Sequence, residues 1–112
     1  MKWTGEPVLE SNKLRYEITQ AGRHQADARQ VVRRHRELLP VRLGQLVSEY
    51  RKQQNSAGKS MRLALKDPRY LAWVEELAEL SSEAVRARVR WETGRMLWNA
   101  RQSLNAYHRD RP

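Results

Sequence analysis

Two long tracts with apolar residues at helical spacing constrain the fold of this chain most strongly. The tracts cover residues 13–53 and 68–109, and the connection between them, 54–67, begins with a polar run. In each tract apolar residues recur at alternating steps of four and three, which is the period of one face of an α-helix. The pattern predicts an all-α fold in which two long helices form an antiparallel hairpin.

The first tract carries one stripe and one proline. The stripe consists of Leu14, Ile18, Ala21, Gln25, Ala28, Val32, His35 and Leu39, and Leu43, Leu46 and Tyr50 continue it. Asn12 stands at the N-cap position, so segment 1–12 is expected to precede the helix. Pro40 lacks a backbone donor and crowds the preceding turn. We therefore expect the first helix to be kinked or broken at Pro40.

The second tract has a clear start and two apolar stripes. Asp67-Pro68 places an acidic cap before a proline at the first helical position. Ser60, in the connection, is a candidate cap for a short turn through Leu65. The first stripe consists of Trp73, Leu77, Leu80, Ala84, Ala87, Trp91, Gly94 and Trp98. The second consists of Val74, Ala78, Ser81, Val85, Val89, Met96, Ala100, Leu104 and Tyr107.

The second stripe needs a neighbour, because an isolated helix pair uses only one narrow seam per helix. The N-terminal segment with Trp3 is too short to cover a helix of roughly 60 Å. We therefore expect a homodimer that forms a helical bundle. The alternative is a compact single-chain bundle with helices broken at Pro40 and near Gly94. Both interpretations treat residues 1–112 as a single helical domain.

The chain has a formal net charge of +9, and the charge is unevenly distributed. Residues 31–60 and 86–112 each carry seven basic and two acidic groups, whereas 61–85 carry three and five. Such a positive field attracts phosphate backbones, although a GC-rich coding sequence also produces many arginines. In a hairpin, the acidic block from Glu75 to Glu83 should lie roughly opposite Arg36 and Arg42. The arginines Arg15, Arg23 and Arg29 should lie near Arg95, Arg101 and Arg109.

The basic clusters suggest two functions. The first is binding of DNA or RNA through arginine–phosphate contacts without sequence readout. Its candidate residues are Arg23, Arg29, Arg33, Arg34, Arg86, Arg88, Arg90, Arg95 and Arg101. Trp91 and Trp98 lie among them and could stack bases, but their heptad spacing favours a core role. The alternative is a protein-protein interaction module, an adaptor, scaffold or inhibitor, whose interface is Trp73, Leu77, Leu80, Trp91 and Trp98.

No catalytic or metal-binding pattern stands out. Gly58-Lys59-Ser60 resembles the end of a phosphate-binding loop, but Gln53 replaces the required glycine. The histidines are scattered and no His-Glu-x-x-His occurs. We expect no enzymatic activity, no cofactor and no metal. The sequence has no cysteine, no run of about 18 apolar residues and no apolar signal-peptide core, which predicts a cytoplasmic protein without a membrane partner.

The second half of the chain supports one resemblance. The run Asp67–Leu71, leading to Trp91–Leu104, resembles the long helix of small helical proteins from bacteriophage recombination and replication gene clusters. The similarity covers less than half of the chain and transfers no functional residue. It implies an accessory protein that handles phage DNA or modulates a host protein.

Overall fold

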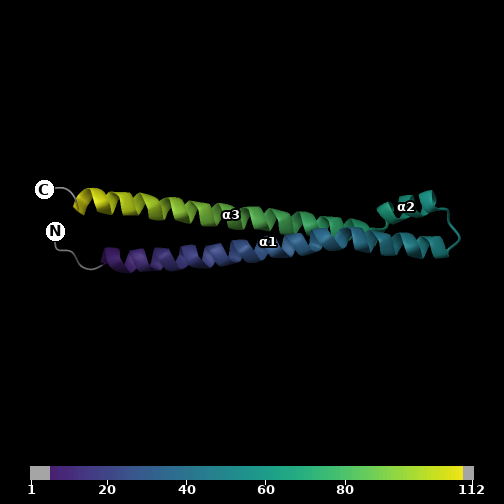
Figure 1. The fold of residues 1–112 in the computed structure, drawn as a ribbon, viewed down its shortest axis with the longest axis horizontal. Coiled ribbons are helices and arrows are strands. Elements are labelled where there is room, and N and C mark those ends of the chain that lie inside the picture. The colour runs from purple at the N-terminus through teal and green to yellow at the C-terminus, as the bar shows by residue number, and fades with distance from the viewer. Residues whose placement is uncertain (1–5, 110–112) are drawn as a thin grey trace. The chain divides into compact units, whose positions relative to one another are not determined.

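The computed structural model describes residues 6–109, with side chains described from residue 12 onward. Three helices account for nearly all of these residues: α1 Glu6–Lys52, α2 Ala57–Lys66 and α3 Pro68–Arg109 (Figure 1). No strand occurs between residues 6 and 109. The predicted all-α class is confirmed, while the role expected of Trp3 lies outside the described residues.

Helix α1 is longer and more continuous than the sequence suggested. It begins at Glu6, so Asn12 lies inside the helix and the predicted cap is wrong. It also continues through Pro40, so of the two predicted outcomes a break is excluded and a kink stays a prediction. Pro40 and Arg36 are both exposed. The Arg36 carbonyl, which has no N–H partner at Pro40, can therefore bond to water instead.

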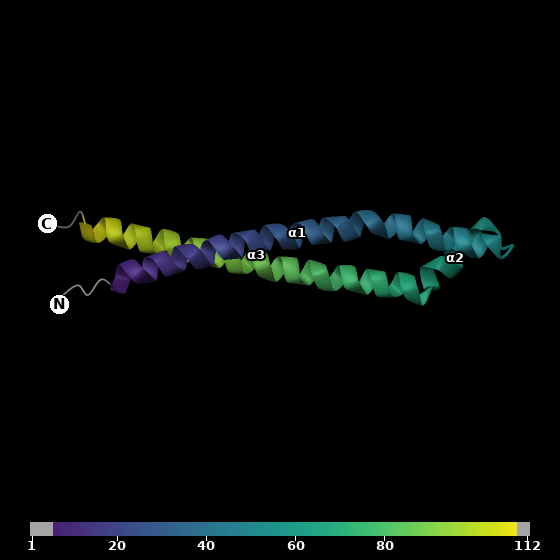
Figure 2. The same cartoon turned by 90° about the horizontal axis from the view of Figure 1, so that it is seen from below.

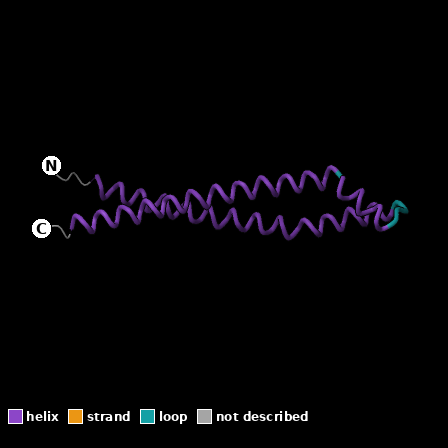
Figure 3. Tube along the Cα trace, turned by 90° about the horizontal axis from the view of Figure 1, so that it is seen from above, coloured by secondary structure: helices purple, strands orange, loops and turns teal. Residues whose placement is uncertain are grey.

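The end of α1 is capped by its own chain. The backbone N–H groups of Gln53 and Gln54 donate to the carbonyls of Tyr50 and Arg51, at 3.2 and 3.0 Å. Gln54 has a φ of 65°, the left-handed conformation common just after a helix. The side-chain amide of Asn55 also donates to the Tyr50 carbonyl, at 2.8 Å. These bonds satisfy terminal carbonyls of α1 before the chain reaches α2, and Figure 3 shows this connection as a loop.

Helix α2 was not predicted at its full length. It is a ten-residue helix whose N-cap is Ser56, because the Ser56 hydroxyl accepts a hydrogen bond from the Lys59 backbone N–H. Ser60 lies inside α2 and is buried, so its predicted capping role is wrong. The other fully buried residue of α2 is Ala64. These small buried residues allow α2 to lie close to the C-terminal part of α1, as Figures 1 and 2 show.

Helix α3 begins and ends where the sequence predicted. The Asp67 carboxylate accepts a hydrogen bond from the Arg69 backbone N–H at 2.8 Å, which is the expected N-cap bond. Pro68 is the first helical residue and Arg109 the last. The acidic cap followed by proline thus fixes this boundary locally.

Contacts group the chain into two units. Unit 1 joins residues 1–27 and 85–112, and unit 2 comprises residues 28–84. Within unit 2, α1 and α3 pack in antiparallel order, because in successive contacts the residue number on α1 falls while the residue number on the α3 side rises. The pairs are Tyr50 with Asp67, Glu49 with Arg69, Arg42 with Trp73, and His35 with Glu76.

Within unit 1, α1 and α3 also pair in antiparallel order, through glycines that face large side chains. A Cβ atom on Gly22 would lie 3.0 Å from Nε1 of Trp91. A Cβ atom on Gly94 would lie 3.0 Å from Cγ1 of Ile18. Both distances are shorter than ordinary van der Waals contact. Glycine is therefore what lets the two helices approach this closely.

The α1 stripe and the first α3 stripe form the seam of each unit. Every member of the α1 stripe from Leu14 to Leu39 is buried or half-buried, and so is every member of the first α3 stripe. The second α3 stripe is exposed at every position except Ser81. Among the described residues, the fully buried apolar side chains are those of Val32, Leu46, Ala64 and Ala87.

Candidate nucleic-acid interface

One side of the helix pair in unit 1 is defined by the contact between Gly22 and Trp91. The Trp91 indole lies against the position where a Gly22 side chain would be. The Arg95 guanidinium carbon lies 4.9 Å from the centre of the Trp91 ring, a cation–π distance. Gly22, Trp91 and Arg95 therefore meet on the same side of the pair.

Helical periodicity adds two more arginines to this side. Arg15 lies seven residues before Gly22, and Arg88 lies seven residues before Arg95. Residues seven apart are two turns apart on one helix face. Arg15, Arg88 and Arg95, which we call the arginine flank, are all exposed.

The local partners of the arginine flank leave hydrogen-bond donors available. Arg88 Nε lies 3.9 Å from Oε1 of Glu92, and both side chains are 57% exposed. Ion pairs between exposed side chains contribute little to stability, so a phosphate can replace the Glu92 carboxylate as the partner of Arg88. Arg95 uses the face of its guanidinium against Trp91. Its N–H groups lie in the guanidinium plane, where they can still bind an anion.

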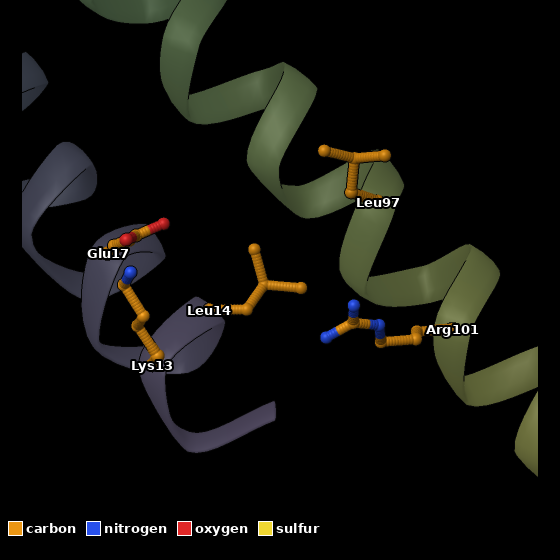
Figure 4. A pocket seen from close by; sticks show the side chains of 5 residues that line it. All are labelled: Lys13, Leu14, Glu17, Leu97 and Arg101. Carbon is orange, nitrogen blue, oxygen red and sulfur yellow. The ribbon is translucent and has the colours of Figure 1, made fainter. Parts of the chain in front are cut away.

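The other side of unit 1 is chemically mixed. An open pocket of about 350 Å³ is lined by Lys13, Leu14, Glu17, Leu97 and Arg101. Figure 4 shows the Arg101 guanidinium reaching from α3 toward Leu14 of α1. A second pocket of about 270 Å³ is lined by Gln20, Ala21, His24, Ala87 and Arg90. Leucine side chains and the Glu17 carboxylate interrupt the positive charge on this side.

The predicted phosphate-binding arginines divide between the two units. Arg23, Arg86, Arg88, Arg90, Arg95 and Arg101 belong to unit 1, and Arg29, Arg33 and Arg34 to unit 2. All of them are exposed except Arg101, which is half-buried. Arg33 also pairs with Glu37 through Nε and Oε1 at 3.1 Å. The predicted set lacked Arg15, although its seven-residue spacing to a small residue was visible in the sequence.

The predicted protein interface lies on the seam rather than on an open face. Trp73, Leu77, Leu80, Trp91 and Trp98 are half-buried. Arg42 stacks over Trp73, with its guanidinium carbon 5.2 Å from the ring centre. The exposed apolar side chains of α3 are different residues: Leu71 and Val74 in unit 2, and Val85, Val89, Met96, Leu97, Leu104 and Tyr107 in unit 1.

The acidic block meets α1 beside Arg36. Glu76 Oε1 lies 3.3 Å from Nε2 of His35, the residue that precedes Arg36, while Arg42 lies over the Trp73 ring. The Nδ1 atom of His35 lies 3.0 Å from the Val31 carbonyl oxygen. When the ring is protonated, both nitrogens can donate to these acceptors.

A polar network ties the start of α3 to the end of α1 in unit 2. The Tyr50 hydroxyl donates to Oδ2 of the buried Asp67 at 2.7 Å, and Arg69 bonds both Asp67 and Glu49. Bonds from Arg69 and then Tyr50 hold the pKa of Asp67 far below its ordinary value. The bond to Asp67 and desolvation raise the pKa of Tyr50. This network anchors structure and uses Arg69 internally, so Arg69 is no phosphate-binding candidate.

The described side chains form no cluster of metal ligands. Among residues 12–109, no group of three or more histidine, aspartate and glutamate side chains could hold a metal ion. Gly58-Lys59-Ser60 lies inside α2, not in a loop after a strand. A search of the same described residues for a helix long and apolar enough to span a membrane found none.

Comparisons with protein-family models, with curated proteins and with solved structures found no match to this chain.

Proposed function

We propose that this chain is a non-catalytic accessory protein that binds nucleic acid through arginine–phosphate contacts without reading sequence. The observation that supports this function most directly is the arginine flank, with three exposed guanidinium groups on one side of unit 1. Phosphate contacts from arginine supply sequence-independent affinity. Exposed Arg23 and Arg86 add further positive charge to the same unit.

The helical placement of the arginines favours backbone contacts over base readout. Arg86, Arg88 and Arg90 alternate along α3, and successive residues of a helix point about 100° apart. Arg88 therefore points about 160° away from Arg86 and Arg90, so the three side chains cannot enter one groove together. Reading base edges requires several side chains from one helix face in the major groove.

The proposed protein is of a phage or mobile-element type, acts in the cytoplasm, and consists of a helical hairpin, kinked at Pro40, that forms a homodimer. The setting follows from the resemblance of the second half of the chain to phage accessory proteins. The dimer would cover the exposed apolar residues of α3, such as Val85 and Val89, each 51% exposed. Contiguous apolar surface of this kind marks interaction sites in soluble proteins.

Fluorescence anisotropy with labelled DNA tests the proposed function. We expect binding at about 50 mM salt that weakens steeply by about 200 mM, because each phosphate contact releases counterions. The variant R15Q/R88Q/R95Q, which removes the arginine flank, should bind more weakly than the wild type. The variant R51Q/K59Q/R62Q removes the same charge from exposed positions of unit 2 and serves as the matched control. Equal losses in both variants, or no loss in the first, would contradict the proposed site.

A protein-protein interaction module is the second candidate function. It is favoured by the exposed apolar side chains of α3 in unit 1, including Met96, which is 71% exposed. The interface would therefore use Val85, Val89 and Met96 in place of the tryptophans of the seam. Light scattering on the wild type and on V85S/V89S separates the two uses of this face. If the wild type is a dimer and V85S/V89S is a monomer, the exposed face of Val85, Val89 and Met96 serves self-association. If the wild type is a monomer, this face is available to a different protein.

A further inference from the structure

We infer that the nucleic acid bound by the arginine flank is a duplex, held at its phosphates, and not a single strand stacked on tryptophan. This inference rests on the proposed function and narrows its ligand class. Two features of unit 1 support it: the environment of Trp91, the tryptophan that lies beside the arginine flank, and the spacing of the three arginines.

One edge and one face of the Trp91 ring are already in contact with neighbouring residues. The position of a Gly22 side chain lies 3.0 Å from Nε1, 3.3 Å from Cδ1 and 3.8 Å from Cε2 of the indole, so α1 passes directly against this edge. The Arg95 guanidinium lies over the ring at 4.9 Å. A base could stack on the face that Arg95 covers only if Arg95 left it. Stacking on aromatic side chains is the main source of affinity for single strands in proteins that bind them without sequence preference.

The three arginines are spaced to take separate phosphates. Arg88 and Arg95 are seven residues apart on α3, which is about 10.5 Å along the helix. Arg15 lies on α1 near the level of Leu97, because Ile18 meets Gly94 and the helices run in opposite directions. Packed helix axes are about 8–10 Å apart. Of the two α3 arginines in the flank, Arg95 is the nearer to Arg15 on α1. These two positions are thus separated by about one interhelical distance.

A duplex presents phosphates in a fixed arrangement that suits such spacing. Its two backbones border grooves of about 6 and 12 Å, and phosphates repeat every 3.4 Å or so along each strand. Cations held about 10 Å apart on two packed helices can each meet a phosphate without rearrangement of the duplex. A flexible single strand would have to be ordered to meet the same three cations, with no stacking on Trp91 to offset that ordering.

Anisotropy titrations with a labelled duplex and with one of its strands, between about 50 and 200 mM salt, test the duplex inference. We expect tighter binding of the duplex. Three phosphate contacts contribute a slope of about −2.7 in log affinity against log salt, or about 40-fold over this range. The slope of R15Q/R88Q/R95Q should therefore be shallower than that of the wild type by about 2.7. The control R51Q/K59Q/R62Q should keep the wild-type slope.

Trp91 fluorescence provides the second readout. In the variant W3F/W73F/W98F, Trp91 is the remaining tryptophan, and circular dichroism checks that its helices are intact. We expect single-stranded DNA to leave Trp91 emission unquenched. Equal or tighter binding of the single strand, or strong quenching by it, would overturn the duplex inference and leave the proposed function standing. No binding of either DNA at about 50 mM salt would overturn the proposed function itself.

Discussion

Gly22 and Gly44 lie in the same helix but differ in what surrounds them. A Cβ atom at Gly44 would meet nothing within 4 Å, whereas one at Gly22 would crowd Trp91. Gly44→Ala should therefore raise the free energy of unfolding by about 1 kcal/mol through helix propensity alone. Gly22→Ala should raise the free energy of unfolding clearly less, because the added methyl group forces the Trp91 indole to move. Urea denaturation followed by circular dichroism measures both, and equal gains would show that Trp91 tolerates the extra methyl.

The carboxyl group of Asp67 predicts a specific pH dependence. Its ordinary pKa is 3.8, and its pKa in the folded chain is much lower because Arg69 and Tyr50 donate hydrogen bonds to the carboxylate. Below about pH 4 the unfolded chain binds the proton first, so this stabilisation is present above that pH and is lost as the pH falls further. Asp67→Asn should be less stable than the wild type at pH 7.

The difference in the free energy of unfolding between the wild type and Asp67→Asn should become smaller as the pH is lowered from 4 toward 2. Urea denaturation at several pH values measures this free energy for both proteins. Tyr50→Phe leaves the carboxylate bonded to Arg69 and should therefore show a smaller change than Asp67→Asn. A difference that stays constant from pH 7 to pH 2 would mean that Asp67 acts through shape and not through its charge.

At the scale of the element, local signals were sufficient for α3 but not for α1 or α2. Asp67 followed by Pro68 fixes the start of α3 by chemistry contained in neighbouring residues. Asn12 has the side chain of a cap but lies inside α1, because a capping residue is also tolerated within a helix. The buried positions of α2, Ser60 and Ala64, are too small to form an apolar stripe. Their burial depends on neighbouring helices and was therefore not visible in the sequence.

Pro40 gives a prediction for the stability of α1. Because α1 continues through this position, the proline removes one backbone hydrogen bond and crowds the preceding turn without ending the helix. Pro40→Ala should therefore increase the free energy of unfolding, by up to about 3 kcal/mol. Thermal denaturation followed by circular dichroism would show this as a higher Tm. A lower Tm would mean that a bend at Pro40 is required for packing in unit 2.

At the scale of the whole molecule, the seam was more predictable than the candidate site. Heptad spacing identified the residues that α1 and α3 turn toward each other within each unit, from Leu14 to Leu39 and from Trp73 to Trp98. The arginine flank depends on a tertiary contact, since only the meeting of Gly22 and Trp91 shows which arginines share a side. Spacing within one helix cannot supply that information, so the arginines predicted to bind phosphate point in several directions around α1 and α3, and Arg15 is not among them.

The salt dependence of duplex binding by the wild-type chain is the most direct test of whether the arginine flank binds phosphates. If the arginine flank binds phosphates, anisotropy should show a log affinity that falls linearly with log salt, with a slope of about −2.7 or steeper between about 50 and 200 mM. An absence of binding at the low salt concentration, or an affinity that does not change across this range, would contradict the account.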